Sequence, residues 1–225
     1  MPLDWADELR RLSKFARRAI EALLAAAALL LLSPVFAVIA LAIELDDGGP
    51  IFFRHARVGR GFREFRLLKF RSMKAGARGA PITGSADPRI TRVGRFLRRC
   101  KLDELPQLVN VLKGDLQFVG PRPEVAPYVQ AFRAQYEVLL RGRPGITDPA
   151  TLAFHHEDLV LGSDGTEEQY TTQVLPRKLE LSLDYARRRT LGSDLRLVGE
   201  TLSVLLSRNR TAGRRSRSLP DARTE

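Results

Sequence analysis

The stretch "ALLLLSPVFAVIALAI", residues 28–43, decides how the rest of the chain is organised. It belongs to an uncharged run of 22 residues, Ala22 to Ile43, and a helix of that length is about 33 Å long, enough to cross the roughly 30 Å hydrocarbon core of a bilayer. Pro34 lies in its middle, where the ring removes one helical hydrogen bond and clashes with the preceding turn. We therefore expect a kink, and the Ser33 hydroxyl can bond a carbonyl group that the kink frees.

The charges on either side of this run favour a segment that enters one leaflet and returns. Residues 10–18 carry five basic side chains and no acidic one, and residues 54–78 carry nine against Glu64 alone. Basic flanks prefer the cytoplasmic side of a membrane, and a straight span would place one flank outside. We predict a re-entrant membrane helix over residues 22–45, broken at Ser33 and Pro34. A single transmembrane helix and a buried helix of a soluble protein are the alternatives.

Apolar residues also recur at helical spacing ahead of this run, with basic residues between them: Trp5, Leu9, Leu12 and Phe15. The pattern predicts an amphipathic helix over residues 1–21 that lies in the membrane interface, with Trp5 at headgroup depth. An ordinary amphipathic helix packed on the globular part is the alternative. The first residues do not have the pattern of a cleavable signal peptide.

The composition of the chain restricts its partners. Its 225 residues have a formal net charge of +11, which implies an anionic partner: nucleic acid, anionic lipid or a phosphorylated substrate. The single cysteine, Cys100, excludes an internal disulfide and suits a reducing compartment. The sequence contains no P-loop, dinucleotide-binding fingerprint, Ser-His-Asp order or zinc-ligand spacing.

Residues 46–206 predict a small, mostly helical domain with one β-hairpin, so the fold class is α+β. The hairpin joins "IFFRHARVG" to "FREFRLLKFRSM" and turns at Gly59–Gly61. A short strand is expected within 115–124, loops over 74–89 and 141–152, and helices over 90–100, 103–114, 124–140, 166–189 and 193–208. Leu195, Val198, Leu202 and Leu205 mark the apolar face of the last helix. Residues 207–225 are polar and basic, and predict a disordered tail.

Three groups of basic residues are candidates for binding anions, although each group by itself is simplest to interpret as a solvated surface. They are Arg66, Lys69 and Arg71; Arg95, Arg98 and Arg99; and Arg122. Arg122 differs from the others because Pro121 and Pro123 fix the backbone on both sides and so orient its guanidinium. A guanidinium forms bidentate contacts with phosphate, so Arg122 is a phosphate-binding candidate.

Asp103 and Glu104 are adjacent carboxylates at an expected helix start. Asp103 as an N-cap, with Glu104 complementing the helix dipole, is one interpretation. The other is chemical, because a carboxylate kept ionised by nearby arginines can act as a nucleophile or a metal ligand. Paired carboxylates also attract Mg²⁺. The run "HHED", residues 155–158, resembles a metal cluster more weakly, since consecutive side chains point in different directions.

Three longer motifs together resemble one protein family. They are "PIFFRHARVGRGFREFRLLKFRSM" at 50–73, "DPRITRVGRFLRRCKLDELPQLVNVLKGDLQFVGPRPE" at 87–124 and "RPGIT" at 143–147. Over residues 15–150, the order and spacing of these motifs resemble those of the bacterial sugar transferases, which are monotopic polyprenyl-phosphate phosphoglycosyl transferases. The resemblance is to the short form of this family, which has only the catalytic domain. The apolar run with its Ser-Pro pair fits the same family.

This resemblance implies a reaction and a site. Members transfer a sugar-1-phosphate from a UDP-sugar to a polyprenyl phosphate such as undecaprenyl phosphate, release UMP and require Mg²⁺. It implies that Asp103 attacks the donor and forms a covalent phospho-sugar intermediate, and that the Asp103–Glu104 pair is catalytic and holds the metal. Lys69, Arg71, Arg98 and Arg122 are the corresponding phosphate-binding candidates. A re-entrant helix would keep both of its ends at the cytoplasmic face of the inner membrane, with membrane lipid of the inner leaflet as a partner and a homodimer as a possibility.

One departure concerns the sugar. Many relatives follow "RPGIT" with Gly-Trp-Ala-Gln, whereas this chain has "DPATLAFHHED", so the donor and its pocket stay open. A catalytically silent scaffold of a polysaccharide assembly complex is the first alternative function. A membrane-anchored nucleic-acid binder is the second, and the absence of a nucleic-acid motif argues against that partner.

Overall fold

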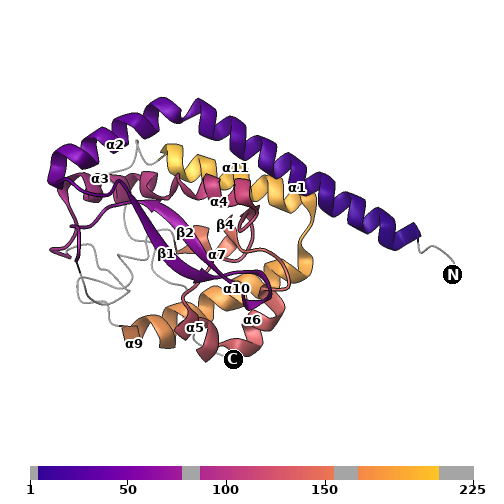
Figure 1. The fold of residues 1–225 in the computed structure, drawn as a ribbon. Coiled ribbons are helices and arrows are strands. Elements are labelled where there is room, and N and C mark those ends of the chain that lie inside the picture. Colours follow the sequence, from indigo (N-terminus) through magenta and orange to yellow (C-terminus); the bar gives the residue numbers. More distant parts are fainter. Residues whose placement is uncertain (1–4, 78–86, 155–166, 208–225) are drawn as a thin grey trace.

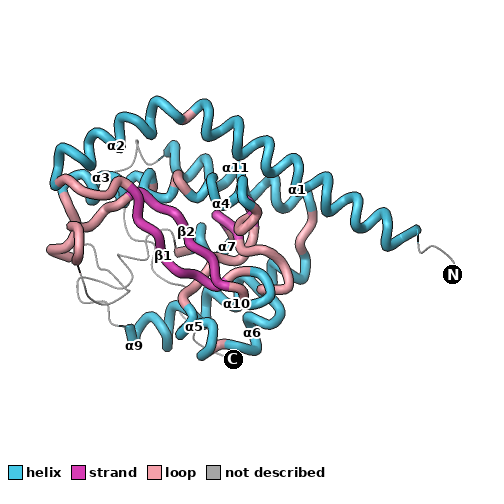
Figure 2. Tube along the Cα trace, in the orientation of Figure 1, coloured by secondary structure: helices cyan, strands magenta, loops and turns pink. Residues whose placement is uncertain are grey.

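A computed structural model describes residues 5–77, 87–154 and 167–207 of the chain. Helices and strands are mixed, and helices predominate, as predicted (Figure 1). Two long N-terminal helices form an arch over one side of the molecule, and the two-stranded hairpin and the shorter helices lie beneath it (Figure 2). The "HHED" run and residues 208–225 of the predicted tail lie outside the described residues, whereas Ser207 is the last residue of a helix.

The break predicted at Ser33 and Pro34 is confirmed. Helix α1, Trp5–Leu31, and helix α2, Ser33–Asp47, meet there, and the pair is bent by 59°. Pro34 occupies the first turn of α2, where a missing N–H costs least, and the Ser33 hydroxyl donates to the Leu30 carbonyl at 2.7 Å. Helix α1 continues through the predicted boundary between residues 21 and 22 without interruption.

Among the described residues, no single helix is both long enough and apolar enough to span a bilayer. The bent pair of helices over residues 15–47, taken together, meets both criteria. The outer faces of the pair are rich in exposed apolar side chains, including Phe15, Leu23, Leu30, Leu41 and Leu45. Exposed apolar surface on this scale is typical of a membrane or protein interaction surface.

The inner faces of the same helices belong to the core. Ala25 of α1 packs with Leu67, Val111 and Leu116, whereas Ile39 and Ile43 of α2 pack with Phe70 and Leu97. These two clusters join the N-terminal helices to the rest of the molecule. Burial of apolar area at about 25 cal/mol per Å² makes such contacts the main stabilising term between them.

Buried ion pairs reinforce this junction. Glu21 on α1 accepts from Arg143 at 2.6 Å and from Arg17 at 3.3 Å. Arg17 also donates to Asp194 at 2.6 Å, and Asp194 accepts from Arg189 at 2.9 Å. Glu21 and Asp194 are both buried, so removal of a cationic partner would leave a buried charge without compensation and destabilise the fold.

The hairpin forms as predicted. Strand β1, Phe52–Val58, pairs antiparallel with β2, Glu64–Phe70. A short 3₁₀ turn, Arg60–Phe62, connects them, and Gly61 adopts φ 64° there, a value that glycine tolerates without strain.

The next helices differ partly from prediction. Helix α3, Arg92–Cys100, is capped by the Thr91 side chain, which accepts from the Gly94 amide at 2.9 Å. The helix predicted over 103–114 begins later: Leu102–Glu104 is a 3₁₀ turn, and α4 runs only from Gln107 to Lys113, where Gly114 ends it. Lys101, with a left-handed φ of 57°, ends α3 and separates it from this turn.

The segment from 115 to 153 contains structure that the sequence pattern did not predict. The expected strand, β3, Gln117–Val119, pairs in parallel with β4, Gly145–Thr147, inside the segment predicted as a loop. A short helix, α7, Pro149–Ala153, follows β4 and is capped by Asp148. The single helix predicted over 124–140 is two helices, α5, Ala126–Ala131, and α6, Arg133–Leu139, separated at Phe132.

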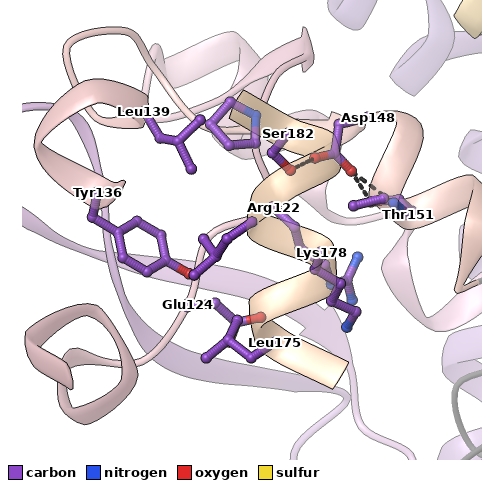
Figure 3. A pocket seen from close by; sticks show the side chains of 12 residues that line it. Arg122, Glu124, Tyr136, Leu139, Asp148, Thr151, Leu175, Lys178 and Ser182 are labelled. Carbon is purple, nitrogen blue, oxygen red and sulfur yellow. Dashed lines mark hydrogen bonds between the residues drawn. The ribbon is translucent and has the colours of Figure 1, made fainter. Parts of the chain in front are cut away.

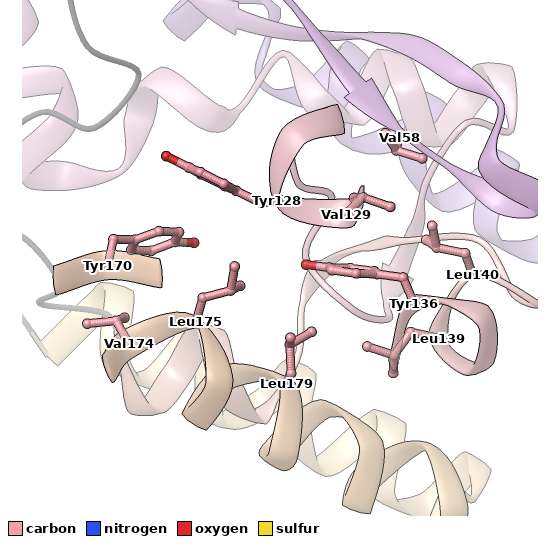
Figure 4. Packing of buried hydrophobic residues seen from close by; sticks show 10 residues of the cluster. All are labelled: Val58, Tyr128, Val129, Tyr136, Leu139, Leu140, Tyr170, Val174, Leu175 and Leu179. Atoms are coloured by element: carbon pink, nitrogen blue, oxygen red, sulfur yellow. The ribbon is translucent and has the colours of Figure 1, made fainter. Parts of the chain in front are cut away.

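The C-terminal helices form and partly enclose the third core cluster. Helix α9, Glu167–Gln169, a π-helical turn, Tyr170–Val174, and helix α10, Leu175–Arg188, are consecutive, as predicted for 166–189. The cluster lies between α5, α6 and α10 and includes Tyr128, Tyr136, Leu175 and Leu179 (Figure 4).

The last predicted helix forms, and two residues of its predicted apolar face are exposed. Helix α11, Leu191–Ser207, buries Asp194 and Leu197, whereas Leu195 and Leu202 are exposed. The helix packs on the rest of the molecule through Leu197 and Asp194, and Asp194 pairs with Arg17 and Arg189.

Replacing Pro34 with alanine should reduce the bend between α1 and α2, because the residue at 34 regains its amide and loses the ring clash. Spin labels at exposed positions 23 and 41, in nanodiscs, should then report a longer separation by pulsed dipolar spectroscopy. Val35→Ala is the control and should keep the original separation. An unchanged distance distribution in Pro34→Ala would show that packing, not proline, sets the bend.

Candidate active site

Three of the predicted site residues meet at one carboxylate. Lys69 on β2 donates from Nζ to Glu104 Oε1 at 2.8 Å. Arg122, which follows β3, donates from Nη2 to the same oxygen at 2.6 Å and from Nη1 to Oε2 at 3.3 Å. The two cations are therefore held next to the Asp103–Glu104 pair, although the three residues come from distant parts of the chain.

A polar side chain on α4 aligns this turn with the hairpin. Asn110 Oδ1 accepts from the Leu68 amide at 2.9 Å, and its Nδ2 donates to the Arg66 carbonyl at 2.8 Å. Asn110 is buried, and it fixes β2 one residue before Lys69. Sequence reasoning missed it, although one polar residue among the apolar residues of "LVNVL" was the available signal.

Asp103 is buried, and its Oδ1 atom makes no hydrogen bond within the described residues. It does not cap α4, whose N-cap position is Pro106 and has no side-chain cap, so the capping interpretation is wrong. Burial raises the pKa of Asp103 above its ordinary value, the negative charge of Glu104 adds to that, and the positive charges of Lys69, Lys101 and Arg98 oppose it.

Glu104 has the opposite electrostatic character. Burial opposes its ionisation, but the charges of Arg122 and Lys69 and the hydrogen bond from Arg122 hold its pKa well below the ordinary value. The adjacent carboxylates are therefore unequal: Glu104 is a fixed anion, and Asp103 is a less stabilised carboxylate with a free oxygen. Environments that separate two such groups are typical of catalytic pairs.

The other two predicted phosphate-binding residues lie in different settings. Arg98 on α3 lowers the pKa of Asp103 through its charge, and its Nη1 atom is buried without a partner in the described part of the chain. Arg71 binds both oxygens of Asp47, at 2.8 and 2.7 Å, and the carbonyl groups of Pro50 and Gly48. The guanidinium of Arg71 therefore stabilises the turn after α2. No hydrogen bond or ion pair in the described residues joins it to Glu104.

A second ion pair positions the Pro-Arg-Pro turn that carries Arg122. Arg57 on β1 donates to Glu124 Oε2 at 2.9 Å and to the Pro123 carbonyl at 3.3 Å. The Tyr170 hydroxyl donates to Glu124 Oε1 at 2.8 Å. Although burial opposes it, the charges of Arg57 and Lys178 lower the pKa of Glu124, so this anion is also permanent. Sequence reasoning did not select Arg57 or Glu124, because nothing local in the sequence links them.

Two glycines allow the turn to lie close to the sheet. A Cβ atom on Gly145 would lie 2.2 Å from the Gly120 amide nitrogen, and one on Gly120 would lie 2.9 Å from the Arg143 carbonyl oxygen. Hydrogen bonds run from the Gly145 amide to the Pro121 carbonyl at 3.0 Å and from the Gly120 amide to the Thr147 carbonyl at 2.9 Å. The backbone on both sides of Pro121 is therefore fixed by direct contact.

A small cavity lies beside Arg122 and is lined in part by α6, α7 and α10 (Figure 3). Asp148 lines it and accepts from the Thr151 amide at 2.7 Å, the Thr151 hydroxyl at 2.7 Å and the Ser182 hydroxyl at 2.5 Å. Its volume of about 20 Å³ suits a single water. The polar residues here support the fold, and the cavity is too small for a substrate.

The carboxylates at this site suit a magnesium ion only together with a substrate. Among residues 5–77, 87–154 and 167–207, no group of three or more His, Cys, Asp or Glu side chains is placed to hold a metal ion. Mg²⁺ is commonly held by one or two carboxylates plus phosphate oxygens, and the free Oδ1 of Asp103 fits that role. Both oxygens of Glu104 already accept from cations.

The chain is similar to known proteins over most of its length. A profile of the family described as bacterial sugar transferase matches residues 12–208. The UDP-glucose:undecaprenyl-phosphate glucose-1-phosphate transferase of Escherichia coli (strain K12) is 36% identical over 195 residues, covering 84% of this chain and 40% of that protein. The protein of the same name from Caulobacter vibrioides is 35% identical, with 85% and 70% covered. The exopolysaccharide production protein ExoY of Rhizobium meliloti (strain 1021) is 32% identical, with 89% and 90% covered. The chain therefore spans less than half of the E. coli protein and most of ExoY.

Proposed function

Because the chain belongs to the bacterial sugar transferase family, we propose that it transfers a sugar-1-phosphate from a UDP-sugar to a polyprenyl phosphate such as undecaprenyl phosphate, and releases UMP. The names of its relatives in E. coli and C. vibrioides support the substrate classes. One observation carries the proposal: the buried Asp103 carboxylate has a free oxygen beside an anion that holds Lys69 and Arg122 in place.

The first step is attack by an Asp103 oxygen on the β-phosphorus of the donor. A bond forms between that oxygen and phosphorus, the bond from phosphorus to the bridging oxygen breaks, and UMP leaves with the electron pair. The incomplete stabilisation of the Asp103 anion favours this role, because a carboxylate with a raised pKa is more nucleophilic than one held by hydrogen bonds.

The second step reverses the first with a different nucleophile. A phosphate oxygen of the polyprenyl phosphate attacks the phosphorus of the aspartyl intermediate, and the Asp103 carboxylate leaves. The product is a polyprenyl diphosphate sugar. Lys69, Arg98 and Arg122 offset the charge on the transferring phosphoryl group, and Glu104 orients Lys69 and Arg122 for that purpose.

Mg²⁺ is the proposed cofactor. Asp103, together with phosphate oxygens of the donor, would hold the ion. Glu104 would bind it only if Lys69 or Arg122 released one of the carboxylate oxygens. When bound, the ion supplies positive charge that stabilises the phosphoryl group and the leaving phosphate.

The reaction is proposed to take place at the cytoplasmic face of the inner membrane. The exposed apolar faces of α1 and α2 support insertion into one leaflet, and the 59° bend supports re-entry. This would bring a lipid phosphate and a soluble nucleotide sugar to the same site. The inner-leaflet lipid is then a partner, and the pathway is assembly of a membrane glycoconjugate.

The test is UMP release by the full chain in nanodiscs, with undecaprenyl phosphate, Mg²⁺ and a panel of UDP-sugars. We expect UMP from at least one donor, loss of activity with EDTA, and recovery when Mg²⁺ is restored. Turnover that persists in EDTA would contradict the cofactor. No UMP from any donor, in a protein that is folded, would favour a catalytically silent scaffold.

A further inference from the structure

A hollow of about 330 Å³ lies between the hairpin and α5, next to the proposed active site. Its volume is within the range of small-ligand pockets. His55, Arg57 and Glu64 from the hairpin line one part, and Pro127, Tyr128 and Glu167 line the other. The cavity beside Arg122 is far smaller, at about 20 Å³.

Two polar groups that belong to this lining are buried without a hydrogen bond in the described residues. They are Nε of Arg57 and the Tyr128 hydroxyl. The Glu167 carboxylate lies beside that hydroxyl without a well-formed hydrogen bond, and burial together with this carboxylate raises the pKa of Tyr128 to about 12. Tyr128 as a whole is 5% exposed, and its hydroxyl points away from the rest of the core cluster (Figure 4). Leaving a buried polar group unpaired costs about 1–3 kcal/mol, so such groups in a recess indicate a ligand.

The charges of the hollow differ from those around Glu104. Among the described residues, the carboxylates of Glu64 and Glu167 line it, and the cation of that lining, Arg57, is paired with Glu124. Burial, together with the charges of Arg57 and Lys69, lowers the pKa of His55 to about 4, so the imidazole is neutral at physiological pH. A phosphate would be repelled here, whereas a neutral group with many hydroxyls finds donors, acceptors and an apolar wall.

The hollow adjoins the place where the donor phosphates would lie. His55 and Phe53 are on the same face of β1, and Phe53 is opposite Lys69. Two residues along a strand span roughly 7 Å. A group attached to a phosphate beside Lys69 can therefore reach the hollow.

We propose that this hollow binds the sugar of the nucleotide donor, and that His55 and Tyr128 determine which sugar is accepted. This inference rests on the proposed function. It places the neutral, hydroxyl-rich end of the donor against Tyr128 and Arg57, and the diphosphate against Lys69 and Arg122. A ribose in the hollow is the competing arrangement, and the experiment distinguishes the two.

The experiment measures binding in the absence of turnover. In the Asp103→Asn background, calorimetry gives the affinities of UMP, UDP and the UDP-sugar that the panel identifies, or of UDP-glucose if the panel identifies none. We expect Tyr128→Phe to weaken the UDP-sugar about tenfold, as for one lost hydrogen bond, and to leave UMP and UDP unchanged. Tyr185→Phe is the control, because its hydroxyl binds Asp194 at 2.7 Å, away from the hollow.

Each other result overturns the assignment in a different way. Equal weakening of UMP and UDP-sugar would place the nucleoside in the hollow, and no change for any ligand would leave it without a role. Failure of the parent protein to bind any UDP-sugar would overturn the proposed function as well. Tyr128→Phe should melt close to the parent, since its hydroxyl loses no well-formed hydrogen bond within the described residues. His55→Gln should change the ratio of the affinities for two donors that differ in one hydroxyl, and an unchanged ratio would remove His55 from the assignment.

Discussion

Asp103→Asn should reduce UMP release by at least about 10³-fold, because loss of a nucleophile removes the first step while binding survives. The amide has nearly the shape of the carboxylate, so the fold should be retained. Asp184→Asn is the matched control: that aspartate is exposed on α10 and pairs with Arg188 at 3.0 Å, and its replacement should leave turnover unchanged. A fully active Asp103→Asn variant would exclude Asp103 as the nucleophile.

The same variant should be at least as stable as the parent at pH 7. Because burial raises the pKa of Asp103 in the folded state, the native carboxyl binds its proton more tightly than the unfolded one. The contribution of Asp103 to stability therefore falls as the pH rises from the ordinary value of 3.8 through the raised folded value. At pH 7 the ionised group destabilises the fold, and asparagine relieves this. Thermal melts should show a higher melting temperature for Asp103→Asn than for the parent at pH 7, and no such difference at pH 4.

The raised pKa also predicts the pH dependence of turnover. Activity needs the ionised carboxylate, so kcat/KM should rise with pH through a value above 3.8 and then reach a plateau. If the midpoint of this rise in kcat/KM lay at or below pH 3.8, a bound cation or substrate, and not burial, would determine the pKa of Asp103.

Gly145→Ala should destabilise the protein by about 3 kcal/mol, at the upper end for overpacking, and lower its melting temperature by roughly 6–12 °C. The new Cβ would lie 2.2 Å from the Gly120 amide nitrogen and 2.7 Å from the Gly120 carbonyl oxygen, and backbone atoms cannot rotate away as a side chain would. Strands β3 and β4 would separate, and the turn that carries Arg122 would move from Glu104. Activity should therefore fall further than the loss of folded protein explains.

Gly142→Ala is the control, because nothing lies within 4 Å of a Cβ at that position. It should melt within about 2 °C of the parent, as surface substitutions usually do. If Gly145→Ala melted like this control, the close approach of the two strands would not be required for the fold.

Much of the fold and part of the site follow from local pattern. The Ser33–Pro34 break, the hairpin and α3 are each encoded by neighbouring residues, and the structure confirms them. The parallel pairing of β3 with β4 was missed because each strand has three residues and the register joins Gln117 to Gly145, far along the chain. Such short strands give no periodic signal.

The site shows the same division. Lys69, Glu104 and Arg122 belong to specific motifs, and the structure brings them together. Arg71 lies in an equally basic motif but binds Asp47, and Arg57 pairs with Glu124 across 67 positions, which no local reading could reveal. Basic residues in this chain are numerous enough that only their acidic partners distinguish their roles.

The way α1 and α2 contribute Ala25, Ile39 and Ile43 to the interior has a consequence for protein engineering. Cutting the chain after residue 45 to obtain a detergent-free enzyme would uncover Leu67, Phe70 and Leu97 and strip Arg143 of Glu21. Such a truncation should aggregate. The alternative is to replace exposed leucines, such as those at 23, 30, 41 and 45, with glutamate or lysine. These substitutions would make the outer surface polar and leave the interior and the ion pairs intact.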